Sequence, residues 1–174
     1  AVIQKYVTPF RIRQTGERLA AGREISRERL ASLLQSNGYF RVDTVADSGE
    51  FAIRGSIVDL FPAGSEIGLR LDFFGDEIES IRRFNPSDQR SIDQVEHFDI
   101  LPAVEALMDE EAIKRFRVGY RERFGVTATG DPLYQAVSEG RRLSGMDHWL
   151  PLFEERMATI FDHVGADALV IRDS

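Results

Sequence analysis

The sequence predicts an α+β fold, in which an antiparallel meander sheet packed by one helix is followed by a partial α/β segment. Between Phe40 and Leu101, apolar residues alternate with polar ones and short turns interrupt them, as is typical of half-buried strands. A helical stripe precedes this region, and helical periodicity returns after Pro102. We therefore expect two domains, residues 1–102 and residues 103–174.

The first part is expected to begin with an extended segment over residues 6–13, with Pro9 at an edge position, followed by a loop. A helix then begins after Ser26, whose hydroxyl can cap it, and ends near Gly38. The buried stripe of this helix consists of Leu30, Leu33 and Leu34.

About five strands are expected after this helix. Their connections are too short for crossovers, which predicts antiparallel neighbours throughout. Gly55 interrupts the second strand and suggests a bulge within it. The expected strands cover residues 40–45, 51–61, 69–74, 78–81 and 92–101.

Helices are expected in the second part, beginning at Asp109 and at Asp131, and Gly125 is placed to end the first of them. Residues 168–171 are expected to form a short buried strand. The apolar stripe of the first helix consists of Ile113, Phe116, Tyr120 and Phe124. Its basic run is interpreted as a solvated polar face, with nucleic-acid binding as the alternative, and consists of Lys114, Arg115, Arg117, Arg121 and Arg123.

Composition excludes several classes of function. The 174 residues include no cysteine, which excludes disulfides, thiolate metal sites and cysteine nucleophiles. The net charge of −7 disfavours a protein whose main task is to grip nucleic-acid phosphates. No apolar run approaches the roughly 20 residues of a membrane span, and no secretion signal is visible, so we expect a cytoplasmic protein with no membrane partner. The chain begins without methionine and is expected to be part of a larger protein.

No catalytic constellation is visible. The phosphate-binding loop and the nucleophile elbow are both missing, and the three histidines match no metal spacing. The acidic residues of one stretch are attributed to a turn and to outward strand positions: Asp72, Asp76, Glu77 and Glu79. We therefore expect no catalytic residue, no metal and no cofactor in this chain.

One strand face offers a candidate protein-binding surface. Alternation places Arg70, Asp72 and Phe74 opposite the apolar positions of their own strand, and Arg54 faces outward from a neighbouring strand. If only one face of the sheet is covered, Phe74 is exposed beside Arg70, which is the usual composition of a binding hot spot. Alternatively, Phe74 packs under a loop and Arg70 only pairs with Asp72. Alternation does not decide between the two.

Two long stretches, residues 49–62 and 70–82, resemble a segment shared by the bacterial transcription-repair coupling factors and the excision-repair protein UvrB. Four stretches are similar to the coupling factors alone: residues 115–117, 120–125, 131–134 and 145–153. Residues 170–174 depart from the acidic box that ends the matching strand of UvrB.

This resemblance implies that residues 1–102 correspond to domain 2 of the UvrB-like region, which recruits the lesion-recognition subunit UvrA. It also implies that residues 103–174 are part of a RecA-like domain 1B without a working nucleotide site. The residues that match the recruiting surface of the family are Arg54, Arg70 and Phe74. Further UvrA-contacting charges of UvrB fall at Arg82 and Arg83.

The expected function is therefore a protein-interaction module that recruits UvrA to stalled transcription complexes for nucleotide excision repair, without enzymatic activity of its own. The resemblance places RNA polymerase, DNA, and ATP with magnesium on domains of an ATP-dependent translocase outside this chain, together with a C-terminal domain that masks the UvrA surface. One alternative is a fragment of a UvrB-type, ATP-dependent damage-recognition protein. Another, an independent hydrolase, has no nucleophile–base pair to support it.

Overall fold

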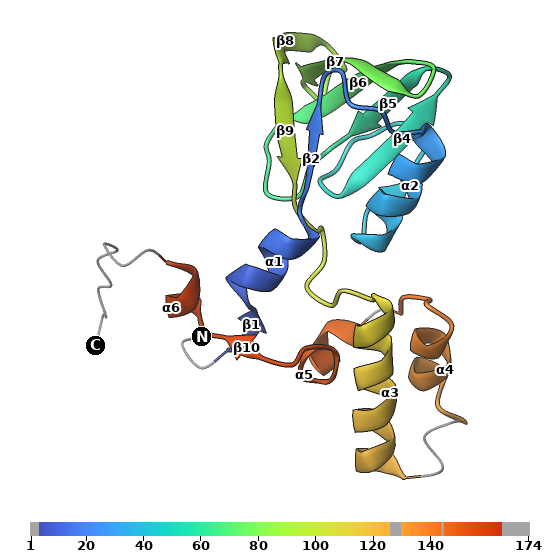
Figure 1. Ribbon diagram of the computed structural model, residues 1–174, viewed down its shortest axis with the longest axis vertical. Helices are drawn as coiled ribbons and strands as arrows, with labels where there is room; N and C mark the ends of the chain where they lie inside the picture. The colour runs from blue at the N-terminus through green and yellow to red at the C-terminus, as the bar shows by residue number, and fades with distance from the viewer. Residues whose placement is uncertain (1–3, 126–129, 144, 165–174) are drawn as a thin grey trace. The chain divides into compact units, whose positions relative to one another are not determined.

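A computed structural model describes residues 4–125, 130–143 and 145–164, and the chain divides into two compact units (Figure 1). One unit comprises residues 15–107, and the other comprises residues 1–14 with residues 108–174. This division differs from the expected boundary at Pro102. Residues 1–14 group with residues 108–174 because strand β1 (Tyr6–Val7) pairs with strand β10 (Met157–Ala158). The functional assignments of residues 1–102 and 103–174 stay predictions.

Residues 15–107 form a six-stranded sheet and a separate two-stranded ribbon. In the sheet, every neighbouring pair except β3–β4 is antiparallel. In sheet order the strands are β3 (Phe40–Arg41), β4 (Glu50–Arg54), β5 (Ile57–Leu60), β6 (Gly68–Phe74), β7 (Glu77–Phe84) and β8 (Ser91–Val95). The ribbon consists of β2 (Glu17–Ala20) and β9 (His97–Ile100).

The expectation that all neighbours are antiparallel is wrong for β3. Phe40 pairs with Glu50 and Arg41 with Phe51 in a parallel register. A two-residue strand is only about 7 Å long. The loop of residues 42–49 is therefore enough to return the chain to the same end of the sheet, and no helical crossover is needed.

The proposed bulge at Gly55 is instead a hairpin turn. Arg54 pairs with Ile57, so Gly55 and Ser56 form a two-residue connection between β4 and β5. Gly55 has φ +60°, which favours glycine in such turns. The expected last strand also divides, because Glu96 separates β8 from β9.

The N-terminal segment was expected to be extended, but only β1 (Tyr6–Val7) is a strand, and a helix, α1 (Pro9–Thr15), follows. Proline is favoured at the first helical position because its missing N–H has no helical partner there. Thr8 caps this helix, since its hydroxyl oxygen accepts a hydrogen bond from the Arg11 amide at 3.2 Å.

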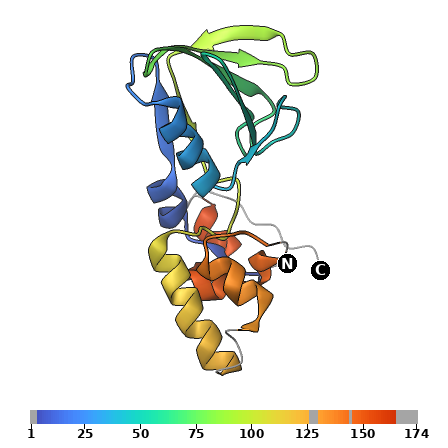
Figure 2. The same ribbon diagram turned by 90° about the vertical axis from the view of Figure 1, so that its right-hand side faces the viewer.

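The core of residues 15–107 lies on one face of the six-stranded sheet. Helix α2 (Arg27–Ser36) packs on this face (Figure 2), and Ser26 caps it by accepting from the Arg29 amide at 3.2 Å, as the sequence predicts. Leu30 and Leu34 are fully buried, whereas the expected Leu33 is only half-buried. Ribbon residues Leu19 and Ile100 belong to the same core.

The other unit confirms the predicted helices. Asp109 caps α3 (Glu110–Phe124), Gly125 follows it with φ +70°, and Asp131 caps α4 (Pro132–Ser138). In the aromatic core, the Phe116 ring stacks on Phe153 at a centroid distance of 4.8 Å. The remaining elements are η2 (Met146–Trp149), α5 (Leu150–Phe153), β10 (Met157–Ala158) and α6 (Ile160–His163).

The strand expected at residues 168–171 lies outside the described residues. In the described part of the chain, the strands of this unit are β1 and β10, so the RecA-like arrangement stays a prediction. No helix of the described residues has the length and hydrophobicity needed to cross a lipid bilayer.

Candidate functional site

The face of the six-stranded sheet that is turned away from α2, the outer face, carries two rows of paired side chains. Directly paired residues of neighbouring strands point to the same face. The first row crosses four strands through Arg54, Ile57, Asp72 and Ser80. The second row crosses Ala52, Asp59, Arg70, Arg82 and Gln94.

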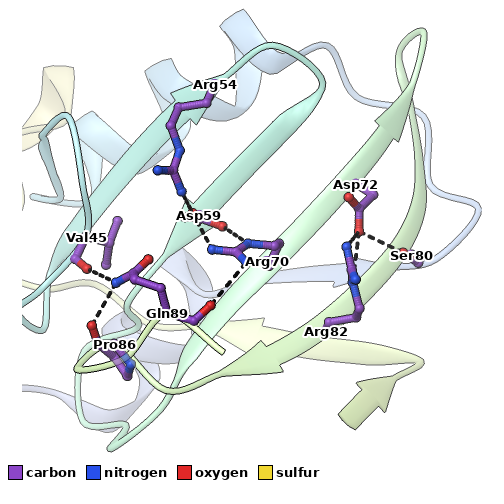
Figure 3. Close-up of polar contacts among 9 residues, drawn as sticks. All are labelled: Val45, Arg54, Asp59, Arg70, Asp72, Ser80, Arg82, Pro86 and Gln89. Atoms are coloured by element: carbon purple, nitrogen blue, oxygen red, sulfur yellow. Dashed lines mark hydrogen bonds and ion pairs between the residues drawn. The ribbon is translucent and has the colours of Figure 1, made fainter. Parts of the chain in front are cut away.

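The second row contains a buried carboxylate, that of Asp59 (Figure 3). Asp59 is completely buried, and its two oxygens accept hydrogen bonds from Arg70, with Nε to Oδ1 at 2.7 Å and Nη2 to Oδ2 at 3.0 Å. Arg54 forms an ion pair with the same Oδ2. A buried carboxylate is tolerated when it is paired and hydrogen-bonded in this way.

Arg70 is held on several sides. Besides the bonds to Asp59, its Nη1 donates to the backbone oxygen of Gln89 at 3.4 Å, and its guanidinium lies 4.9 Å from the ring centroid of Phe84. The hydrogen bonds to Asp59 raise the pKa of Arg70. The side chain of Arg70 is only 16% exposed, whereas that of Arg54 is 48% exposed. Arg54 is therefore the more accessible of the two guanidiniums.

A second acid–arginine group lies beside the first (Figure 3). Oδ2 of Asp72 accepts hydrogen bonds from Nη2 of Arg82 at 2.6 Å, from Nε of Arg82 at 3.1 Å and from the Ser80 hydroxyl at 3.1 Å. Both Asp72 and Arg82 remain partly exposed. The proposed pairing of Arg70 with Asp72 is therefore wrong, because Asp72 pairs with Arg82 and Arg70 pairs with Asp59.

Phe74 is the exposed aromatic residue at the end of β6. Its side chain is 78% exposed, so the alternative in which it packs under a loop is wrong. It follows Asp72 by two residues and pairs with Glu77 beside the turn at Gly75. Alternation therefore places Phe74 on the same face as Asp72 and Arg70.

Arg83 is not brought together with the other predicted residues. It pairs with Leu69, which belongs to the buried core, so Arg83 lies on the face of the sheet that carries α2. Its Nε donates to Oδ1 of Asp93 at 2.6 Å. This hydrogen bond raises the pKa of Arg83 and lowers that of Asp93.

The far end of the outer face is covered. Phe84, Val45 and Ala52 form a small apolar cluster there. Gln89 links the loops that contain Val45 and Pro86, since its Nε2 donates to the backbone oxygens of Val45 at 3.0 Å and Pro86 at 2.7 Å (Figure 3). What remains accessible is the open outer face, defined by Arg54, Arg70, Asp72, Phe74 and Arg82 around the buried Asp59.

Sequence reasoning missed Asp59. A signal was present, because Asp59 is the charged residue of an otherwise apolar run from Ile57 to Phe61. Its partners lie across two neighbouring strands, and only the strand register identifies them.

Other candidate sites have simpler explanations. Within the described residues, no group of three or more histidines, aspartates and glutamates is placed to hold a metal ion. On α3, Lys114 and Arg117 are exposed, as expected for a polar helix face. Arg115 instead donates from Nε to the backbone oxygen of Phe153 at 2.7 Å and so ties α3 to α5.

Comparison with known proteins places these features in a family. A family model described as "UvrB interaction domain" matches residues 18–105, which include the whole six-stranded sheet, α2 and the open outer face. The transcription-repair-coupling factor of Escherichia coli (strain K12) is 42% identical over 86% of this chain and 13% of its own length. That of Haemophilus influenzae is 42% identical over 79% of this chain and 12% of its own length. That of Bacillus subtilis (strain 168) is 30% identical over 99% of this chain and 16% of its own length. The chain thus spans 12–16% of the length of these relatives.

Proposed function

The chain belongs to the UvrB interaction domain family, and from this premise we propose that it is a protein-interaction module that recruits UvrA. By this contact, a transcription-repair coupling factor brings UvrA to stalled transcription complexes for nucleotide excision repair in the cytoplasm. This chain supplies the contact, while an ATP-dependent DNA translocase activity resides in other parts of the parent protein.

The observation that carries the proposal is the exposure of Phe74 on the same face of the sheet as partly exposed arginines. A single exposed apolar side chain is ordinary in a soluble protein. Phe74, however, lies on the same open face as Arg54 and Arg82, whose side chains are 48% and 40% exposed. Aromatic residues and arginine are the types enriched at binding hot spots.

The aromatic and basic residues of the open outer face have different tasks in this proposal. Phe74 inserts into an apolar pocket of UvrA and loses its contact with water. Arg54 and Arg82 use the guanidinium groups that remain accessible to donate charge-assisted hydrogen bonds to carboxylates or carbonyls of UvrA. Arg70 is only 16% exposed, so its contact with UvrA is limited to the small part of its side chain that stays accessible.

Arg83 lies on the face of the sheet opposite to the proposed contact surface. A flat partner surface laid over the open outer face would not reach the opposite face of the sheet, where Arg83 lies. We therefore propose Arg54, Arg70, Phe74 and Arg82 as the contacting set, with Arg83 outside it.

For residues 103–174 we propose a part of domain 1B, with a RecA-like relationship and no working nucleotide site. The resemblance of four stretches to the coupling factors supports this assignment: residues 115–117, 120–125, 131–134 and 145–153. RNA polymerase, DNA, and ATP with magnesium are proposed to bind elsewhere in the parent protein. A C-terminal domain of the parent is proposed to cover the open outer face until transcription stalls.

Isothermal titration calorimetry of this chain with purified UvrA tests the proposal. We expect binding by the unsubstituted chain and a loss of about tenfold or more in Arg54→Ala, since a hydrogen bond to a charged group contributes about 1.5–3 kcal/mol. Arg18→Ala is the matched control. Arg18 is also an exposed, ion-paired arginine of residues 15–107, but it lies on the ribbon that covers the core side of the sheet. Absence of binding by the unsubstituted chain, or equal losses in both variants, would contradict the proposal.

A further inference from the structure

Asp59 is completely buried beneath the open outer face, yet both of its carboxylate oxygens bind arginines of that face. Oδ1 accepts from Arg70, and Oδ2 accepts from Arg70 and pairs with Arg54. A buried charge requires strong pairing, because water cannot solvate it. Two guanidiniums satisfy this requirement.

The same contacts fix the conformation of Arg54. This residue ends β4 immediately before the turn at Gly55, and about half of its side chain is in solvent. An arginine in such a position has many rotamers, and binding a partner would have to restrict them. The ion pair with Asp59 restricts the guanidinium before any partner arrives.

The charge balance leaves Arg54 available for a partner. One carboxylate faces two guanidiniums, so the three groups carry a net positive charge. Arg70 uses two N–H groups on Asp59 and is nearly covered. The excess positive charge is therefore presented mainly through Arg54.

We propose that Asp59 is a positioning residue of the open outer face, which orients Arg54 and Arg70 for UvrA without touching UvrA itself. This inference rests on the proposed function. Asp59 acts through the arginines because it has no solvent-accessible surface to offer a partner. Asp72 differs in this respect, since it is partly exposed beside Arg82.

A double-mutant cycle on UvrA affinity tests this role in the full 174-residue chain. We expect Asp59→Asn to weaken binding about tenfold or more, as Arg54→Ala does. Because Arg54 depends on Asp59, adding Arg54→Ala to Asp59→Asn should weaken binding by less than about twofold more. If Asp59 matters only for folding, two results are possible. Either the affinity losses of Asp59→Asn and Arg54→Ala multiply in the double variant, or Asp59→Asn shows no loss once affinity is expressed per folded molecule.

Asp99→Asn is the matched control for removing the carboxylate of an arginine pair. Asp99 pairs with Arg18 on the ribbon of the same compact unit, remote from the open outer face. Its replacement should leave UvrA affinity unchanged.

A second variant covers the case in which Asp59→Asn does not fold. Asp59→Asn/Arg70→Gln replaces the buried ion pair with two neutral amides, and such replacements are often tolerated better than a lone unpaired charge. In this background, Arg54→Ala should again add less than about twofold, whereas in Arg70→Ala alone it should still cost several-fold.

The outcomes distinguish UvrA binding by the chain from the positioning role of Asp59. If the unsubstituted chain fails to bind UvrA, both the proposed function and this inference are overturned. If it binds, and Arg54→Ala weakens binding equally with and without Asp59, only the positioning role of Asp59 is overturned. We expect the affinity losses of Asp59→Asn and Arg54→Ala not to multiply in the double variant. We also expect Asp99→Asn to bind UvrA with unchanged affinity.

Discussion

Replacing Phe74 with alanine removes the exposed aromatic anchor of the open outer face. Phe74 is 78% exposed, and an aromatic side chain can bury about 200 Å². A partner that covered it completely would remove about 160 Å² from water, worth about 4 kcal/mol at about 25 cal/mol per Å². Coverage of half this area is worth about 2 kcal/mol. Phe74→Ala should therefore weaken UvrA binding by about thirtyfold to several hundredfold.

Calorimetric titration of UvrA into the variant measures this loss, and urea denaturation run alongside measures folding. Because Phe74 is mostly in solvent in the free chain, its replacement should change the unfolding free energy by less than about 0.5 kcal/mol. Phe10→Ala is the control, since Phe10 is 65% exposed and lies in the other compact unit. An anchoring role for Phe74 is contradicted if Phe74→Ala, while folded, binds within about threefold of the unsubstituted chain, or if Phe10→Ala loses as much affinity.

Three further predictions concern the stability of residues 15–107. Asp59→Asn should lower the unfolding free energy by about 3 kcal/mol in urea denaturation, because it leaves the Arg70 guanidinium without its buried partner. Gly38→Ala should lower the melting temperature by several degrees in calorimetry, because Gly38 has φ +85° and its new Cβ would lie 2.4 Å from a methyl group of Val104. The hydrogen bond from an arginine on β2 lowers the pKa of Asp99, so its stabilising contribution is present above the unfolded pKa of about 3.9 and is lost as pH falls through the lower folded pKa. Urea denaturation between about pH 2 and 6 should therefore show a weaker acid dependence in Asp99→Asn than in the unsubstituted chain.

Local chemistry explains what the sequence predicted correctly. Ser26 and Asp131 were expected to cap helices, because an oxygen acceptor at that position hydrogen-bonds free amide groups of the first turn. The acidic run from Asp109 was expected to start a helix, because negative charge is favourable at that end. The structure places all three side chains in capping hydrogen bonds. Alternation likewise placed Phe74 away from the core, since that period belongs to the strand itself.

The errors fall where local pattern is ambiguous. After Gly55 the buried positions shift by one, from Ile53 to Val58 and Leu60. A bulge and a two-residue turn both shift the phase of alternation by one residue, so the pattern alone cannot separate them. Strand β2 was missed for a similar reason, because Leu19 is its only fully buried residue.

The site was predicted in part. Orientation of Arg54, Arg70 and Phe74 followed from alternation within single strands. Pairing between strands depends on register, so the link of Arg70 to Asp59 could not be found in this way. Alternation also indicated that Arg82 and Arg83 could not both lie on the outer face, because adjacent strand residues point to opposite faces. In the structure, Arg82 is the one on the outer face.

The arrangement of the open outer face favours binding with little further ordering. Arg54 and Arg82, whose flexible side chains would otherwise have to be immobilised by a partner, are already paired with Asp59 and Asp72. Phe74 has only two side-chain torsions to restrict, so its burial costs little entropy. Preorganised groups retain more of their interaction energy in the complex, and the gain is mostly a slower dissociation. Replacing the buried carboxylate in Asp59→Asn should therefore shorten the lifetime of the UvrA complex, even though every atom proposed to touch UvrA is still present.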